Sequence, residues 1–123
     1  SISQQWANRN LQAKFTNVIL HEGYVYGLNN RIMTCIDVET GKRMWRGGRY
    51  GHGQLLLANG VFIVQSESGS VHLVEATPDK HHEIAELPGL EARTWNHPVL
   101  VGNTLLVRNS AEMVAFKFTL KNR

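Results

Sequence analysis

A repeated pattern of two apolar runs joined by a two-residue turn constrains the fold of this 123-residue chain more than any other feature. The pattern occurs three times, over residues 17–27, 54–64 and 97–107. The turn dipeptides are Glu22-Gly23, Asn59-Gly60 and Gly102-Asn103. Because each contains a residue that tolerates a positive φ, each apolar pair is predicted to form a β-hairpin.

Further strands are predicted after each hairpin. A third strand is expected over 31–37, 70–76 and 112–118, and a fourth over 43–46 and 83–87. Gly23 precedes Gly60 by 37 residues and Gly60 precedes Asn103 by 43, which brackets the roughly 40 residues of a four-stranded β-propeller blade. The sequence therefore predicts an all-β chain of antiparallel blades. A small β-sandwich or open meander is the alternative, and the recurring turn chemistry disfavours it.

The spacing of two tryptophans suggests how the blades are divided. Trp6 precedes Trp45 by 39 residues, so residues 1–16 are predicted to hold the fourth strand of a preceding blade, at 5–8, plus a connecting loop. The remaining units are a blade over 17–46, a blade over 54–87, and three strands of a third over 97–118. Three blades are fewer than the ~4–8 of natural rings. An incomplete ring has open strand edges, so other blades or copies of the chain itself are the expected partners.

Residues 35–45 carry the most specific motif. Asp37 is followed by a Thr-Gly-Lys turn and then by a tryptophan. The segment resembles the Ala-x-Asp-x-x-Thr-Gly-Lys-x-x-Trp repeat of quinoprotein-type, PQQ-like β-propellers, with Cys35 in the alanine position. Its structural residues are Asp37, Thr40, Gly41, Lys42 and Trp45. The resemblance extends from Trp6 to about Phe118, although residues 75–83 lack both the Thr-Gly-Lys turn and the tryptophan.

The resemblance implies two functions from different classes. The favoured one is a non-catalytic binding or scaffold segment of a larger exported bacterial protein, periplasmic or secreted. Residues 1–5 show no signal-peptide pattern. The alternative is part of a PQQ-dependent dehydrogenase, an oxidoreductase that holds its quinone and a Ca²⁺ ion in the central funnel. Such enzymes have a vicinal cysteine pair and an acidic cluster, whereas this chain has one cysteine, so no cofactor is expected in this chain.

The segments that lead from one blade into the next are the candidate binding surface. They cover residues 8–15, 47–53 and 91–97, and in a propeller they lie at one face near the central funnel. An aromatic or imidazole ring recurs in them at Phe15, His52 and Trp95, with Lys14, Arg49 and Arg93 close by. Cations beside flat rings suit an anionic or aromatic ligand, or a protein partner. The candidate residues are Arg49, Tyr50, His52, Arg93, Trp95 and His97. The alternative is that the rings pack between blades and the cations are solvated.

Several other classes of function find no support in the sequence. The net charge of +3 comes from scattered cations without a nucleic-acid-binding module. No apolar run approaches the ~20 residues that span a bilayer. The single Cys35 is expected to be a buried, inert thiol. The six histidines form no His-x-His or His-x-x-x-His pair, so no metal site and no catalytic residues are predicted.

Overall fold

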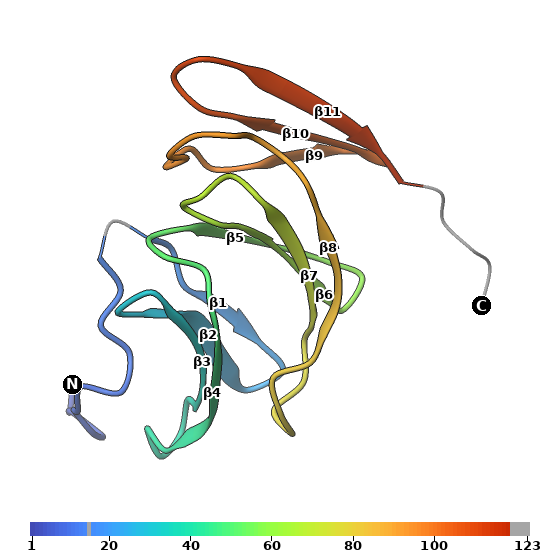
Figure 1. Cartoon of the computed structure of the whole chain (residues 1–123). Helices are drawn as coiled ribbons and strands as arrows, with labels where there is room; N and C mark the ends of the chain where they lie inside the picture. Colours follow the sequence, from blue (N-terminus) through green and yellow to red (C-terminus); the bar gives the residue numbers. More distant parts are fainter. Residues whose placement is uncertain (15, 119–123) are drawn as a thin grey trace.

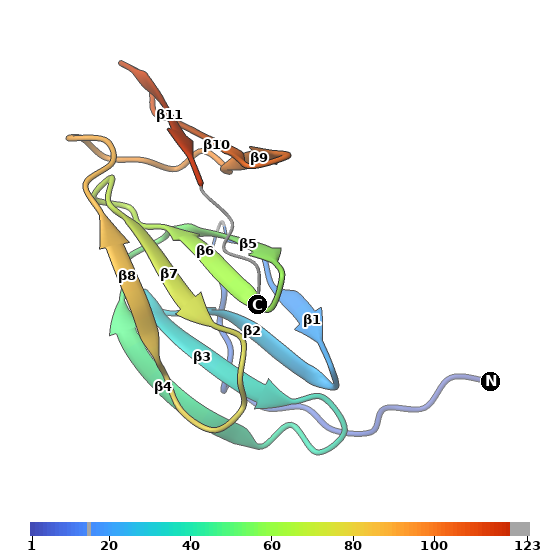
Figure 2. The same cartoon turned by 90° about the vertical axis from the view of Figure 1, so that its right-hand side faces the viewer.

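The computed structural model describes residues 1–14 and 16–118, which form three antiparallel sheets and no helix. Sheet 1 contains β1 (Ile19–His21), β2 (Tyr24–Asn29), β3 (Ile32–Asp37) and β4 (Arg43–Arg49). Sheet 2 contains β5 (Gln54–Ala58), β6 (Val61–Gln65), β7 (Val71–Glu75) and β8 (Glu83–Leu87). Sheet 3 contains β9 (Val99–Val101), β10 (Thr104–Arg108) and β11 (Met113–Lys117). In each sheet, strands that are consecutive in sequence are paired, and the sheets are stacked in chain order (Figures 1 and 2). The all-β prediction is confirmed.

The predicted hairpins have the expected turn chemistry. In the first turn, φ is 48° at Glu22 and 85° at Gly23, and in the second it is 51° at Asn59 and 73° at Gly60. Two consecutive positive φ values are the type I′ pattern of a two-residue β-turn. In the third hairpin only Gly102 has a positive φ, of 60°, which fits a type II′ turn. The strands on either side are therefore in register directly across each turn, for example at Ala58 and Val61.

Two apolar cores hold the stack together. The first lies between sheets 1 and 2 and includes Tyr26, Met33 and Phe62. The second lies between sheets 2 and 3 and is built around Ile63 and Leu105. Because side chains alternate along a strand, neighbouring Phe62 and Ile63 serve opposite cores, and sheet 2 is buried on both faces. The buried thiol of Cys35 belongs to the first core, and burial raises its pKa to about 11, as expected of an inert cysteine.

The Asp37 motif forms the turn that the sequence predicts. The Asp37 carboxylate accepts hydrogen bonds from the backbone N–H of Glu39 (2.9 Å) and of Thr40 (3.4 Å). Gly41, with φ of 76°, donates its N–H to the Asp37 carbonyl at 2.8 Å. A side chain at Gly41 would collide with the ring of Trp6, so this position also needs glycine for space.

Two tryptophans make the same docking contact. The Trp45 indole N–H donates to the Thr77 carbonyl at 2.7 Å, which joins β4 to the β7–β8 turn of the next sheet. The Trp6 indole N–H donates to the Val38 carbonyl at 2.9 Å, in the β3–β4 turn of sheet 1. Each tryptophan precedes its acceptor by 32 residues. Trp6 therefore contacts sheet 1 as Trp45 contacts sheet 2.

Three features of the predicted strands are corrected. Residues 5–8 are not a strand, because no described strand lies beside them to complete a ladder. The fourth strand of sheet 1 extends to Arg49 instead of ending at 46, since Gly48, with φ of 75°, forms a bulge that keeps the ladder paired with β3. The third strand starts at Ile32, and Arg31 belongs to the turn before it.

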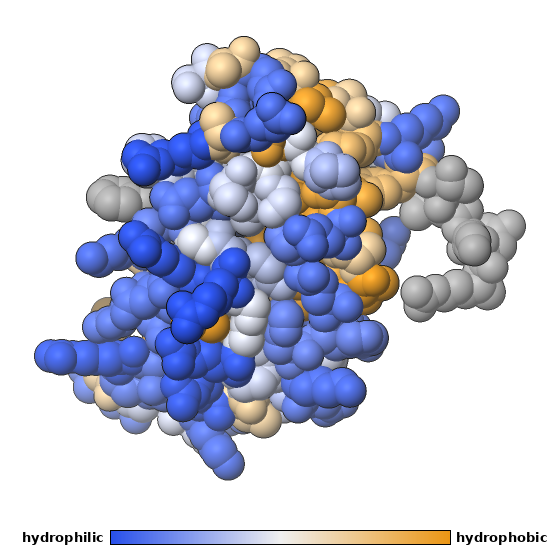
Figure 3. Space-filling model, viewed as in Figure 1, coloured by the Kyte–Doolittle hydropathy of each residue, from blue (hydrophilic) through white to orange (hydrophobic). Residues whose placement is uncertain are grey.

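The stack of three sheets is open. In sheet 3, β10 is the one described strand that pairs with β11, and Val99, Val101 and Met113 are exposed on the face that points away from sheet 2. Figure 3 shows hydrophobic residues along the right-hand side of sheets 2 and 3 and hydrophilic residues over the connecting segments. None of the described residues forms a helix that could cross a membrane.

Candidate functional site

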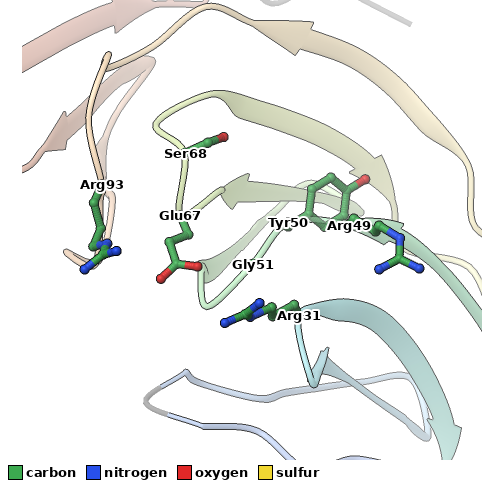
Figure 4. Close-up of a pocket in the computed structure, with 7 residues that line it drawn as sticks. All are labelled: Arg31, Arg49, Tyr50, Gly51, Glu67, Ser68 and Arg93. Atoms are coloured by element: carbon green, nitrogen blue, oxygen red, sulfur yellow. The ribbon is translucent and has the colours of Figure 1, made fainter.

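An open hollow of about 440 Å³ lies at the strand ends, on the side of the stack where the segments that connect the sheets meet the β2–β3 and β6–β7 turns. Figure 4 shows three arginine side chains spread around its opening, with a carboxylate between them. Its walls come from both turns, from the β4–β5 connection and from the β8–β9 connection. The lining residues are Arg31, Arg49, Tyr50, Gly51, Glu67, Ser68 and Arg93.

A chain of backbone hydrogen bonds fixes these segments to one another. The Tyr50 N–H donates to the Arg31 carbonyl at 2.9 Å, and the Glu67 N–H donates to the Tyr50 carbonyl at 2.8 Å. The Thr94 N–H then donates to the Glu67 carbonyl at 2.7 Å. Residues from all four wall segments are thus held by main-chain contacts, and the site does not depend on loose loops for its shape.

None of the three arginines of the hollow forms a salt bridge with a carboxylate of the described residues. Among residues 1–14 and 16–118, no carboxylate oxygen lies within 4.0 Å of an arginine or lysine nitrogen. The Arg93 guanidinium lies 5.0 Å from the centre of the Trp95 ring, and the Arg31 Nε–H donates to His52 Nε2 at 3.4 Å. The hollow therefore offers three positive charges whose hydrogen-bonding capacity is largely unused.

The single carboxylate of the hollow, Glu67, is already occupied. Its Oε2 accepts a hydrogen bond from the Trp95 indole N–H at 2.6 Å, and its Oε1 accepts a longer one from the His52 N–H at 3.4 Å. The hydrogen bond from Trp95 is the largest cause that lowers the pKa of Glu67. Glu67 thus stays ionised and orients Trp95, and it leaves the site with more positive than negative charge.

Tyr50 has a structural position as well as a place in the wall. It is buried, and its hydroxyl turns away from the hollow toward sheet 2, where it donates to Glu83 Oε1 at 2.7 Å and lies 2.8 Å from His81 Nε2. Burial is the main cause that raises the pKa of Tyr50 and lowers the pKa of His81. The phenol and the imidazole are therefore both neutral links between sheets 1 and 2.

The structure brings most of the predicted site residues together. Arg49, Tyr50 and Arg93 line the hollow, and His52 and Trp95 contact its residues. His97 does not line it, and its Nδ1 lies 2.7 Å from the Pro98 carbonyl oxygen. Phe15, the remaining ring of the recurring set with His52 and Trp95, lies outside the described residues.

Two important residues of the hollow, Arg31 and Glu67, were not among the predicted site residues. Glu67 lies in a turn that the sequence interpretation treated as a plain hairpin connection, and Arg31 was predicted to be the first residue of the strand after its turn. Arg31 has φ of 78°, a backbone conformation that favours glycine or asparagine. The available signal in the sequence was a bulky cation at the second position of a two-residue turn, where glycine or asparagine is favoured.

Comparison with known proteins supports the fold alone. No protein-family model matches the chain, and no curated protein matches it. Among solved structures, the computationally designed Ika4 protein is similar with a TM-score of 0.65 at 7% identity, over 83% of this chain and 64% of that one. The computationally designed Ika8 protein is similar with a TM-score of 0.64 at 8% identity, over 82% of this chain and 32% of that one. The chain thus spans less than two thirds of the length of either designed protein.

Proposed function

We propose that this chain is a non-catalytic binding segment of a β-propeller and that its hollow binds an anionic ligand with a flat ring. The observation that carries the proposal is that Arg31, Arg49 and Arg93 all line the hollow and that none of them forms a salt bridge with a described carboxylate. Guanidinium groups bind carboxylates and phosphates through paired, charge-assisted hydrogen bonds. The Trp95 ring, which is 57% exposed, lies beside Arg93 and offers a surface for stacking.

The propeller part of the proposal rests on the repeated contacts between sheets. The docking of Trp45 on sheet 2 and of Trp6 on sheet 1 is one contact made twice, 39 residues apart. The backbone hydrogen bond from Tyr50 to Arg31 likewise recurs one sheet later, from Thr94 to Glu67. The recurrence of both contacts supports a similar step from one sheet to the next, as between the blades of a propeller.

The partner that we propose for the open end of the stack is a second copy of the chain. The strand that carries Trp45 is the fourth of its sheet, and sheet 3 has no fourth strand among the described residues. Residues 5–8 of another copy can add to β11 as that strand. Trp6 of that copy would keep its contact with its own sheet 1, so the exposed face of sheet 3 would be covered.

A titration with simple anions tests the ligand proposal. Benzene-1,3,5-tricarboxylate combines three carboxylates with a flat ring, and citrate has the charge without the ring. We expect calorimetry to detect saturable binding of the first compound and weaker binding of the second. The double variant Arg49→Ala, Arg93→Ala should lose binding at least tenfold, since two of the three cations are removed. Lys80→Ala, in the β7–β8 turn, is the matched control.

The same titration separates the proposal from the dehydrogenase alternative. Binding that stays within twofold in the double variant would contradict the anion site. Addition of pyrroloquinoline quinone with Ca²⁺ is the second arm, because this quinone also carries carboxylates. A bound chromophore with alcohol- or glucose-dependent dye reduction would replace the non-catalytic proposal by the oxidoreductase one. Binding without turnover would support the binding segment.

A further inference from the structure

A group of metal-ligating side chains lies on the face of sheet 2 that points toward sheet 1. His72 on β7 is directly opposite Glu86 on β8. In a regular strand Glu83 would point to the other face, because it is three residues from Glu86. The ladder shifts register between Leu73 and Val74, and Glu83 is paired with Val74. This bulge turns Glu83 to the same face as His72 and Glu86.

The bulge belongs to the fold, whereas the ligand set belongs to sheet 2 alone. Sheet 1 has the same register shift, between Cys35 and Ile36. In the corresponding positions it carries Thr34, Arg43 and Arg46, which bind no cation. One imidazole and two carboxylates thus replace a hydroxyl and two guanidinium groups on an otherwise equivalent pair of strands.

The three side chains are close enough to share an ion. His72 Nδ1 lies 2.7 Å from Glu83 Oε1, and Glu86 Oε1 lies 4.0 Å from the other ring nitrogen, Nε2, of which only one can bind a given ion. One ligand atom from each residue lies within 4.8 Å of the others. Glu83 Oε2 and both oxygens of Glu86 accept no hydrogen bond from the described residues, so these acceptors are open.

We propose that His72, Glu83 and Glu86 form a zinc-binding site. Nitrogen and carboxylate ligands together suit Zn²⁺ better than Ca²⁺ or Mg²⁺, which take oxygen ligands. Zinc bonds of ~2.0–2.1 Å place ligand atoms roughly 3.3 Å apart. Glu86, with a side chain 60% exposed, has the freedom to move inward by that amount. Three protein ligands leave the fourth tetrahedral position to water.

Neighbouring groups hold the ligands in place. Tyr50 donates its hydroxyl to Glu83 Oε1, which fixes that carboxylate while its second oxygen stays open. The Ser70 hydroxyl lies 2.8 Å from His72 Nε2, and the Tyr50 ring packs 4.7 Å from the His72 ring. Outer contacts of this kind orient metal ligands and raise affinity. A hydrogen-bonded network without an ion is the competing account.

The Glu86→Gln variant separates the two accounts. The Glu86 side chain makes no hydrogen bond with the described residues, so the amide should leave the fold intact while it removes one charged ligand. After treatment with a chelator, we expect the intact chain to bind one equivalent of Zn²⁺ in calorimetry and its thermal midpoint to rise with excess Zn²⁺. Glu86→Gln should weaken binding at least tenfold, and Mg²⁺ should not compete.

Glu75→Gln is the matched control. Glu75 pairs with His82 at 2.8 Å in the same sheet, so it is a histidine–glutamate pair without the third ligand. Its removal should leave zinc binding within twofold. Equal zinc affinity in both variants, or no saturable binding by the intact chain, would overturn the proposal and leave the hydrogen-bonded network. Neither outcome bears on the arginine hollow, which lies at the turns and connections.

Discussion

Arg31 has a backbone conformation that a glycine would adopt at lower cost. Its φ of 78° places a side chain with a Cβ in the left-handed region, which costs roughly 1–2 kcal/mol for an ordinary residue. The same residue supplies one cation to the hollow and the carbonyl that accepts the Tyr50 and Gly51 N–H groups. Strain at a residue with such contacts is consistent with a functional role.

We therefore predict opposite effects of Arg31→Gly on stability and on binding. Relief of the strain, less the greater chain entropy of glycine in the unfolded state, should stabilise the fold by about 0.5–1 kcal/mol. Loss of the cation should weaken binding of benzene-1,3,5-tricarboxylate several-fold. Urea unfolding and calorimetry measure the two effects. A variant that is less stable than the parent and binds as tightly would contradict this account.

Trp95 controls the ionisation of Glu67. Because the indole N–H hydrogen bond lowers the pKa of Glu67, Trp95→Phe should move this pKa upward, toward its ordinary value of 4.5. The depressed pKa stabilises the folded state above pH 4.5, and this contribution is lost as the pH falls through the folded pKa. NMR titration of the carboxyl carbon measures the shift. An unchanged titration curve would show that the hydrogen bond does not hold the carboxylate.

At the level of whole elements, the sequence was sufficient where local rules decide the structure. The fourth strand of sheet 2 was predicted at 83–87 and is Glu83–Leu87. The hairpins were found because glycine and asparagine mark turns and because apolar runs mark buried strands. The strand predicted at residues 5–8 was wrong because a strand requires a paired neighbour, and pairing is a property of the assembled sheet. The hollow was found only in part, since Glu67 enters it through contacts between sheets.

The docking tryptophans allow a matched comparison between two elements. Trp45 is 8% exposed and Trp6 is 37% exposed, although both donate the same hydrogen bond. Trp45→Ala should destabilise the fold by about 3–5 kcal/mol, the cost of emptying a buried aromatic site. Trp6→Ala should cost about 1 kcal/mol, near the net value of one hydrogen bond. Equal losses in urea unfolding would mean that the N-terminal segment is as tightly packed as β4.

At the scale of the whole molecule, the chain is a stack with one side left open. Sheet 2 is buried on both faces, while sheet 3 exposes Val99, Val101 and Met113, and no other strand of residues 1–14 and 16–118 covers the outer edge of β11. Free edges and apolar faces of this kind favour association with another chain. The sequence predicted such openness from the number of repeats, and the structure shows which strand and which face are concerned.

The measurement that tests the account most directly is the mass of the chain in solution by light scattering. If a second copy covers sheet 3, we expect a discrete species whose mass is two or more times the 13.9 kDa of one chain. Val99→Glu should dissociate it, because the charge would be buried in the proposed interface. Ile84→Glu on β8 should not, although Ile84 is 51% exposed and Val99 is 50% exposed. A parent chain that stays at 13.9 kDa at the highest concentration tested would contradict the assembly.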